Sequence, residues 1–164
     1  MRLYSIYEDV NPNVAIVRYD QDSYDYDTNI AADQADQVAK NSGIRISRDK
    51  ELLYIALVGD AVVGAVWSSL YEDPDNPGVF VFDFDVAVEP KFRSPRPEYQ
   101  IGIKLIEAAL QEYRYHRSEH PTYIRVWVVN PKLVRFLERQ YGFEIEAEHG
   151  DGSAHMVYHG KTRP

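Results

Sequence analysis

The stretch "VAVEPKFRSPRPEYQIGIKLIEAAL", residues 86–110, decides the fold because it reads as a strand, a loop and a long helix. From Ile101 onward its apolar residues recur at helical spacing, which predicts a helix that packs on a sheet. This helix opens with Ile101-Gly102-Ile103, a pattern typical of a phosphate-binding turn. Pro95 and Pro97 just before it have no N–H to donate. The loop is therefore either an altered anion site or an ordinary connection into a structural helix.

The strand before this loop is extended by "VFVFDFDVAV", residues 79–88, which is too hydrophobic for a surface position. This composition predicts a central strand of a sheet. Asp83 and Asp85 interrupt it and share one face by alternation. Burying a carboxylate without a partner is costly. Either this face opens to a wet cleft or pairs with an arginine, or the carboxylates take part in a reaction.

Strands and a helix are also predicted nearer the N-terminus. Residues 2–8 alternate loosely and predict a first strand. A helix is expected from an N-cap at Thr28 to an end near Gly43. Residues 52–72 form two apolar runs around Gly59-Asp60, which predicts an antiparallel hairpin.

The C-terminal part continues the alternation of strands and helices. A strand is predicted at residues 122–129, a helix at 131–141 with Pro131 in its first turn, and a hairpin at 143–160 around Gly150-Asp151-Gly152. The resulting order is helix, hairpin, strand, helix, strand, helix, hairpin. It predicts one α/β domain over residues 1–164, with a mixed central β-sheet flanked by α-helices.

Composition narrows the class of protein. A chain of 164 residues with 45% hydrophobic residues fits one domain with a real core. No apolar run is long enough to span a membrane, and the N-terminal sequence argues against a secretory signal. The absence of cysteine excludes disulfides, thiol catalysis and cysteine-ligated metals. A cytoplasmic protein is the simplest expectation.

The net charge and the spacing of the histidines limit which binding partners and metal sites are expected. The net charge of −8 disfavours free nucleic acid and anionic lipids. Many of the acidic residues lie between Asp20 and Asp36. This stretch is either a solvated loop followed by the start of a helix, or the rim of a binding site that attracts a cationic substrate. His155 and His159 would lie about 13 Å apart in a strand, too far to share one ion. No metal site is therefore predicted.

Three further stretches are informative in combination: "VAVEPKFR" after a hairpin, "IGIKLIEAAL", and "VWVVNPKLVRFLERQYGFEIEAE". Together they resemble the GNAT superfamily of N-acetyltransferases. They are similar, in order, to the family's strand ending in Val-x-Pro-x-x-Arg, its coenzyme-binding helix and its later Asn-to-Gly-Phe segment. The resemblance is strongest over residues 50–158. It implies a GNAT-like acyltransferase domain that uses acetyl-CoA as co-substrate.

The resemblance implies a set of cofactor contacts. Matching forward from Pro90 keeps Arg93 and Gly102 in their family roles and places an insertion in "SPRPEY". Strand backbone would receive the pantetheine arm, and the amides and cations of the turn would hold the pyrophosphate. Asn130 matches an asparagine that contacts the cofactor, although a helix N-cap explains it equally well. The implied contacts are Val86, Ala87, Val88, Arg93, Gln100, Ile101, Gly102, Ile103, Lys104 and Asn130.

The same resemblance suggests catalytic residues. An amine with a pKa near 10 must lose a proton before it attacks a thioester. Asp85 is the first candidate for this base because it lies nearer the family's splay point, and Asp83 is the second. The tyrosine that the family places in the later helix is absent, since its position corresponds to Leu137 or Glu138. Tyr141 could replace it as the general acid only if the end of that helix is rearranged.

The sequence thus favours transfer of an acetyl or other small acyl group from acetyl-CoA to an amine by direct attack. The expected acceptor is cationic, a small molecule or a lysine, and a homodimer is compatible with the sequence. A competing reading keeps the fold as a catalytically inactive binding or assembly module that no longer uses coenzyme A. A third, acylation of a modified nucleic-acid base, is the least favoured because of the negative charge.

Overall fold

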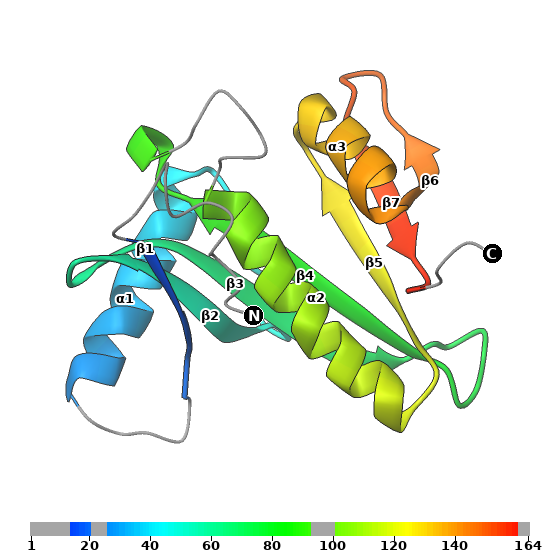
Figure 1. Cartoon of the computed structure of the whole chain (residues 1–164), viewed down its shortest axis with the longest axis horizontal. Helices are drawn as coiled ribbons and strands as arrows, with labels where there is room; N and C mark the ends of the chain where they lie inside the picture. Colours follow the sequence, from blue (N-terminus) through cyan, green and yellow to red (C-terminus); the bar gives the residue numbers. More distant parts are fainter. Residues whose placement is uncertain (1–13, 21–25, 93–100, 161–164) are drawn as a thin grey trace. The chain divides into compact units, whose positions relative to one another are not determined.

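The computed structural model describes residues 14–20, 26–92 and 101–160. In these ranges the chain has three α-helices and a seven-stranded mixed sheet with the order β1-β2-β3-β4-β5-β7-β6 (Figure 1). This confirms the predicted α/β class. The chain divides into two compact units, Met1–Ser68 with Asp85–Leu110 and Ser69–Phe84 with Gln111–Pro164.

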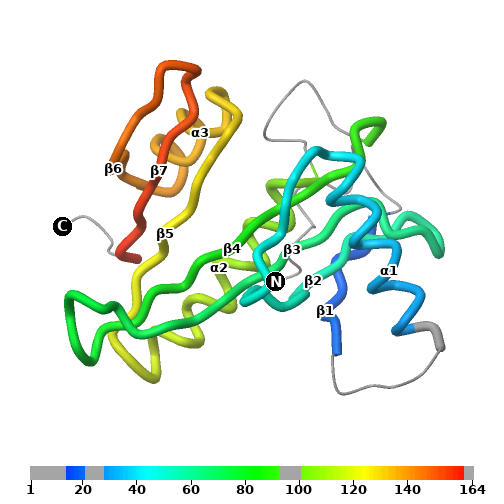
Figure 2. The backbone as a smooth tube through the Cα atoms, turned by 180° about the vertical axis from the view of Figure 1, so that it is seen from behind, coloured from blue at the N-terminus to red at the C-terminus, as the bar shows by residue number. Residues whose placement is uncertain are grey.

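The first unit is built on three antiparallel strands. β1 (Val14–Arg18) pairs with β2 (Glu51–Val58), and β2 pairs with β3 (Ala61–Glu72) (Figure 2). Gly59 in the connecting turn has a φ of 62°, a conformation that glycine adopts without steric cost. The predicted hairpin is therefore confirmed. The expected first strand, residues 2–8, lies outside the described residues, and β1 was not predicted.

Helix α1 (Tyr26–Asn41) packs against this hairpin. It begins two residues before the predicted N-cap, so Thr28 lies inside the helix and that prediction is wrong. Residue preferences locate a helix terminus only to within a few residues, because Thr is also tolerated inside a first turn. The predicted end is confirmed by Gly43, whose φ is 71°. The buried residues of this core cluster are Ala35, Val38, Ala39, Ile55, Val62, Ala65, Trp67 and Ala87.

Strand β4 (Phe80–Val88) lies between β3 and β5, which confirms the predicted central strand. A short 3-10 helix at Pro90–Phe92 follows it, and α2 (Ile101–Glu119) begins after the loop. The start of α2 is enclosed, because Ile101, Ile103 and Leu105 have no exposed surface. The stripe of apolar residues that predicted this helix is therefore its buried face.

Among the glycines of the first unit, Gly64 on β3 is the most closely surrounded by neighbouring atoms. An added Cβ would lie 3.0 Å from Leu105 Cδ1 of α2 and 3.1 Å from the Ala87 carbonyl oxygen of β4. Contacts this short require the neighbouring atoms to move. Glycine is thus needed here for close approach, since its φ is not in the left-handed region.

The second unit carries the C-terminal part of the sheet. β5 (Thr122–Val128) pairs antiparallel with β7 (Ala154–Tyr158), and β7 pairs with β6 (Glu144–Glu148), which confirms the predicted strand and hairpin. Helix α3 (Pro131–Tyr141) is also confirmed and lies beside β5 and β7 (Figure 2). Among the described helices of the chain, none has the length and apolarity needed to cross a membrane.

Candidate functional site

The pairing of β4 with β5 is short. These parallel strands are in register over three residue pairs, Phe80↔Thr122 to Phe82↔Ile124, whereas β4 runs on to Val88. The residues expected to receive the pantetheine arm, Val86, Ala87 and Val88, therefore belong to the part of β4 that lies beyond this register. They extend the strand in the first unit.

The first turn of α2 packs directly on this end of β4. A Cβ at Gly102 would lie 3.6 Å from Val88 Cγ2 and 4.0 Å from Val86 Cγ1, which is ordinary van der Waals contact. The structure thus brings together the predicted pantetheine contacts and the predicted phosphate turn. Ile103 and Lys104 are fully buried in this turn. Arg93 and Gln100 lie outside the described residues.

Asp85 forms an ion pair with a residue that the sequence did not suggest. Lys50 Nζ donates to Asp85 Oδ2 at 2.8 Å, and the two side chains are 9% and 26% exposed. The partner is a lysine from the segment before β2, not the arginine considered above. Lys50 and Asp85 are 35 residues apart in the sequence, so no local sequence pattern indicates their contact. Asp83 is half-buried and belongs to the second unit.

The end of β4 is also held by the C-terminal end of α1. Asn41 Nδ2 donates to Glu89 Oε1 at 2.9 Å, and Ser42 Oγ donates to the Val88 carbonyl at 3.0 Å. Gln37 Nε2 in turn donates to Asn41 Oδ1 at 2.8 Å. The sequence pattern predicted only that a helix ends near these residues. It gave no indication of their hydrogen bonds to Val88 and Glu89. The strand end that leads into the predicted phosphate turn is therefore fixed from one side.

Asn130 and Tyr141 lie at the two ends of α3 in the second unit. Asn130 Oδ1 accepts from the Lys132 N–H at 3.0 Å, so the residue is an N-cap, as one of its two interpretations predicted. Tyr141 is the last residue of the helix and lies edge-on to Phe136, with ring centroids 6.0 Å apart. Gly142, with a φ of 77°, ends α3 in a regular left-handed cap. The helix end thus lacks the rearrangement that an acid role for Tyr141 was expected to need.

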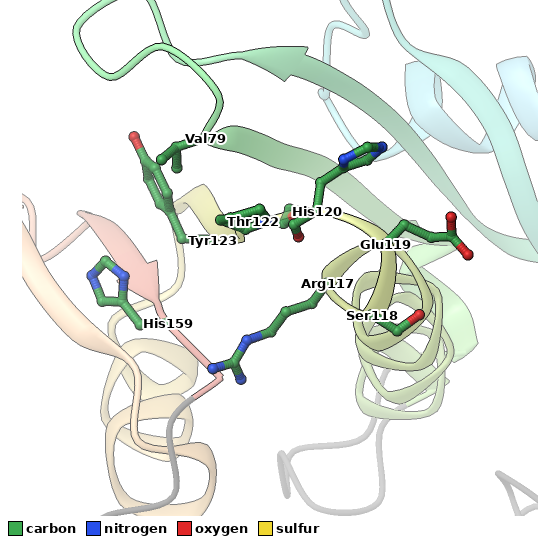
Figure 3. Close-up of a pocket in the computed structure, with 9 residues that line it drawn as sticks. Val79, Arg117, Ser118, Glu119, His120, Thr122, Tyr123 and His159 are labelled. Atoms are coloured by element: carbon green, nitrogen blue, oxygen red, sulfur yellow. Dashed lines mark hydrogen bonds between the residues drawn. The ribbon is translucent and has the colours of Figure 1, made fainter.

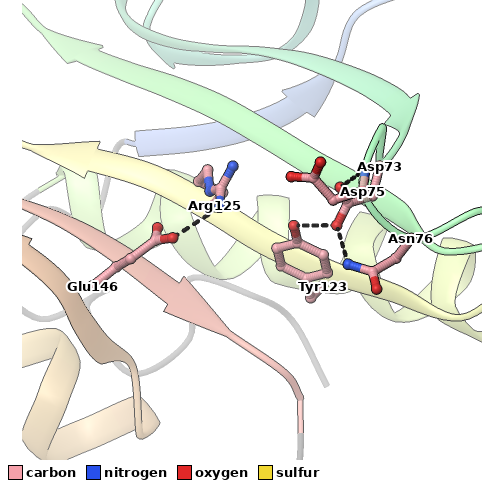
Figure 4. A network of polar contacts seen from close by, with 6 residues as sticks. All are labelled: Asp73, Asp75, Asn76, Tyr123, Arg125 and Glu146. Atoms are coloured by element: carbon pink, nitrogen blue, oxygen red, sulfur yellow. Dashed lines mark hydrogen bonds and ion pairs between the residues drawn. The ribbon is translucent and has the colours of Figure 1, made fainter.

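A polar network that the sequence did not reveal joins β5 to the turn before β4 (Figure 4). Asp73 accepts from Tyr123 Oη at 2.8 Å, from Asn76 Nδ2 at 3.1 Å and from the Asp75 N–H at 3.0 Å. These bonds, led by the one from Asn76, lower the pKa of Asp73. Burial, and then the hydrogen bond to Asp73, raise the pKa of Tyr123 to about 12. Arg125 on the same strand pairs with Glu146 at 2.8 Å.

This network predicts a pH dependence that Tyr123→Phe removes. Because the pKa of Tyr123 is raised by folding, its stabilising effect is complete below pH 10 and is lost as the pH rises towards about 12. We expect the free energy of unfolding of the wild-type protein to fall more steeply over this window than that of Tyr123→Phe. Urea unfolding at several pH values measures the difference. Parallel curves for the two proteins would contradict the assignment.

A cavity of about 490 Å³ opens at the C-terminal end of α2, within the second unit (Figure 3). Its polar lining includes Arg117, His120 and His159. The ring of His159 lies 5.4 Å from that of Tyr123, and Arg117 donates to the Gly160 carbonyl. None of the predicted catalytic or cofactor-binding residues is among the residues that line it. It therefore gives no support to the predicted site.

Two histidines of the terminal hairpin are in contact with each other. His149 Nε2 and His155 Nδ1 lie 2.9 Å apart, a contact made by the β6–β7 turn. The predicted separation of about 13 Å concerned a different pair, His155 and His159. In residues 14–20, 26–92 and 101–160, no group of three or more histidine or acidic side chains could hold a metal ion.

The fold is similar to that of solved acetyltransferases. Arabidopsis thaliana Naa50, in complex with the bisubstrate analogue CoA-Ac-MVNAL, shares 16% identity over 88% of this chain and 97% of its own, with a TM-score of 0.57. A GNAT-family acetyltransferase from Streptococcus pneumoniae shares 12% identity over 88% and 98%, also at 0.57. YncA from Salmonella typhimurium, in a structure with acetyl-CoA, shares 14% over 92% and 96%, at 0.58.

No protein-family model matches the chain, and no curated protein matches its sequence. The structural likeness covers most of the chain at identities of 12–16%, a level at which it establishes the fold alone. The chain therefore has the fold of the GNAT acetyltransferases across most of its length.

Proposed function

We propose that this protein is an N-acetyltransferase that moves an acetyl or small acyl group from acetyl-CoA to the amine of a cationic acceptor. The observation that carries the proposal is the junction of β4 and α2. There, a strand that runs beyond its register with β5 ends against the first turn of a helix. An extended pantetheine arm has amides that can pair with a strand, and a helix N-terminus favours a pyrophosphate.

Asp85 is the proposed general base. It precedes Val86, the first proposed pantetheine contact, so its carboxylate belongs to the part of β4 that would receive the thioester end of the cofactor. Its 26% exposure gives solvent and an acceptor access to the side chain. The carboxylate would take a proton from the acceptor ammonium, directly or through water, and the neutral amine would attack the thioester. Without cysteine, no acyl-cysteine intermediate is available, which favours direct attack.

The other proposed roles rest on the sequence resemblance. Asn130 would contact the cofactor, and Asp83 would be the second candidate base. Tyr141 would protonate the leaving thiolate only if the end of α3 departs from the left-handed cap that the structure shows. Arg93 and the turn from Gln100 to Lys104 would hold the pyrophosphate. The burial of Lys104 makes the backbone amides of this turn, rather than its ammonium, the better proposed contact.

A cationic acceptor is proposed from charge. The chain carries a net charge of −8, which attracts cations over the distance of a Debye length. Within the acidic stretch, Asp33 and Asp36 are exposed on α1. A small polyamine and a lysine side chain both have the required chemistry.

The binding step predicts that acetyl-CoA stabilises the folded protein. At about a hundred times its Kd, the ligand should add about 2.7 kcal/mol to the free energy of unfolding, which corresponds to a rise in Tm of several degrees. Differential scanning fluorimetry with acetyl-CoA, and with ATP as an anion control, measures it. A shift with acetyl-CoA that ATP does not reproduce supports the proposal.

Gly102→Ala is the matched variant for this experiment. The added methyl would lie beside Val86 and Val88, where the pantetheine arm is proposed, at contact distances that the folded chain tolerates. We expect acetyl-CoA affinity to fall by about tenfold, or about 1.4 kcal/mol, without loss of stability in the free protein. No shift at millimolar acetyl-CoA in either protein would contradict the proposal and favour the inactive binding module.

A further inference from the structure

An amine of the chain itself already occupies the position that the acceptor amine is expected to reach. Lys50 Nζ lies 2.8 Å from Asp85 Oδ2, the carboxylate proposed as the general base. Both residues belong to the first unit, so this contact is part of one compact body. The Lys50 side chain is only 9% exposed, so its ammonium is held at the carboxylate rather than extended into solvent.

We propose that Lys50 is an internal acceptor and that the protein acetylates it on Nζ. This inference rests on the proposed function, because it needs acetyl-CoA at the end of β4. It adds a modification site to that function. Asp85 connects Lys50 with the proposed cofactor site. Its carboxylate contacts the Lys50 ammonium, and it is followed directly by Val86, where the pantetheine arm is proposed to begin its strand-like pairing.

The reaction is balanced without any further reactant. The Asp85 carboxylate takes one proton from the Lys50 ammonium, and the neutral Nζ attacks the thioester carbonyl carbon. An N–C bond forms and the C–S bond breaks, so that sulfur leaves as the coenzyme A thiolate. Nζ loses a second proton as the amide forms. One of the two protons ends on the thiol of coenzyme A and the other in solvent.

Acetylation would change the electrostatics at Asp85. It replaces the Lys50 ammonium with a neutral amide, which removes the ion pair and one positive charge. A cationic external acceptor would then meet the carboxylate without competition from an internal cation. Acetylated protein should therefore bind a cationic acceptor more tightly than unmodified protein.

The difference in exposure between Lys50 and other lysines provides a control for non-enzymatic acetylation in solution. Lys40, Lys91 and Lys132 are exposed, whereas Lys50 is largely buried. A reaction with free acetyl-CoA in solution favours the accessible amines. Selective modification of the buried Lys50 requires that the protein itself brings the reactants together.

The test is to incubate the full chain with isotopically labelled acetyl-CoA, follow the intact mass over time, and map the label by peptide mass spectrometry. We expect one label per chain at Lys50, at a rate independent of protein concentration. Asp85→Asn should slow the labelling by about a hundredfold or more. Lys50→Arg, which keeps the positive charge, should take up no label at this position while retaining the thermal shift with acetyl-CoA.

Three outcomes would overturn the inference, and the first two differ in what happens to the proposed function. In the first, acetyl-CoA produces a thermal shift, but the label is found on Lys40, Lys91 and Lys132 and not on Lys50, or no label is found at all. Lys50 is then not an acceptor, and the proposed function still stands. The absence of both label and thermal shift removes both. Equal labelling of Lys50 in Asp85→Asn and in the wild type also contradicts the inference, because it separates the modification from the proposed base.

Discussion

Replacing Gly64 with alanine is expected to lower the Tm by several degrees. The new methyl would lie 3.1 Å from the Ala87 carbonyl oxygen, a backbone atom of the central strand, and 3.0 Å from Leu105 Cδ1. Overpacking of this kind costs about 1–3 kcal/mol, and each kcal/mol lowers Tm by about 2–4 °C in a domain of this size. Thermal unfolding followed by circular dichroism measures the change. Gly64→Val should be worse, because a branched side chain fits the site less well.

Gly102→Ala is the control for this prediction. Its added methyl meets Val88 Cγ2 at 3.6 Å, and alanine is favoured over glycine in a helix by about 1 kcal/mol. The Tm of this variant should equal or exceed that of the wild type. Equal Tm values for Gly64→Ala and the wild type would show that β3, β4 and α2 are less tightly packed in the first unit than their contacts indicate.

Asp85→Asn is expected to have the largest effect on activity. If the carboxylate is the general base, the substitution should lower kcat by about 10²–10⁴-fold while the thermal shift with acetyl-CoA is retained. Release of free coenzyme A thiol, measured with a panel of polyamines and lysine peptides, provides the assay.

Lys50→Met separates the carboxylate from the ion pair. This variant removes the same 2.8 Å contact but keeps Asp85. If the ion pair has only a structural role, Asp85→Asn and Lys50→Met should lose activity to a similar extent and should lose similar stability. A loss of kcat much larger in Asp85→Asn than in Lys50→Met assigns the effect to the base. Unchanged turnover in Asp85→Asn would remove Asp85 from the mechanism.

Much of the fold could be predicted from local patterns. The β2–β3 hairpin follows from two apolar runs around Gly59-Asp60, and the end of α1 follows from Gly43. The central position of β4 follows from its hydrophobicity alone. These features are local in origin, because backbone conformation and burial of one segment depend mainly on its own residues. The start of α1 was misplaced because several residues near it are acceptable at a helix terminus.

The candidate site was predicted less fully because its contacts join distant parts of the chain. The sequence identified Asp85 but not its partner Lys50, and it identified Val88 but not the hydrogen bond from Ser42. It left two roles open for Asn130, of which the structure shows the N-cap. Pairings of this kind depend on how the strands are ordered and on which faces the helices cover, which no local pattern records.

By itself the sequence determined the α/β class, the order of most elements, the central strand with its two carboxylates and the absence of cysteine chemistry. Periodicity, turn residues and composition act over a few neighbouring residues, so they can be read along the chain. The tertiary structure alone decided that Lys50 meets Asp85, that the first turn of α2 rests on Val86 and Val88, and that β4 runs beyond its register with β5. The physical reason is that these contacts arise only when segments tens of residues apart are packed together.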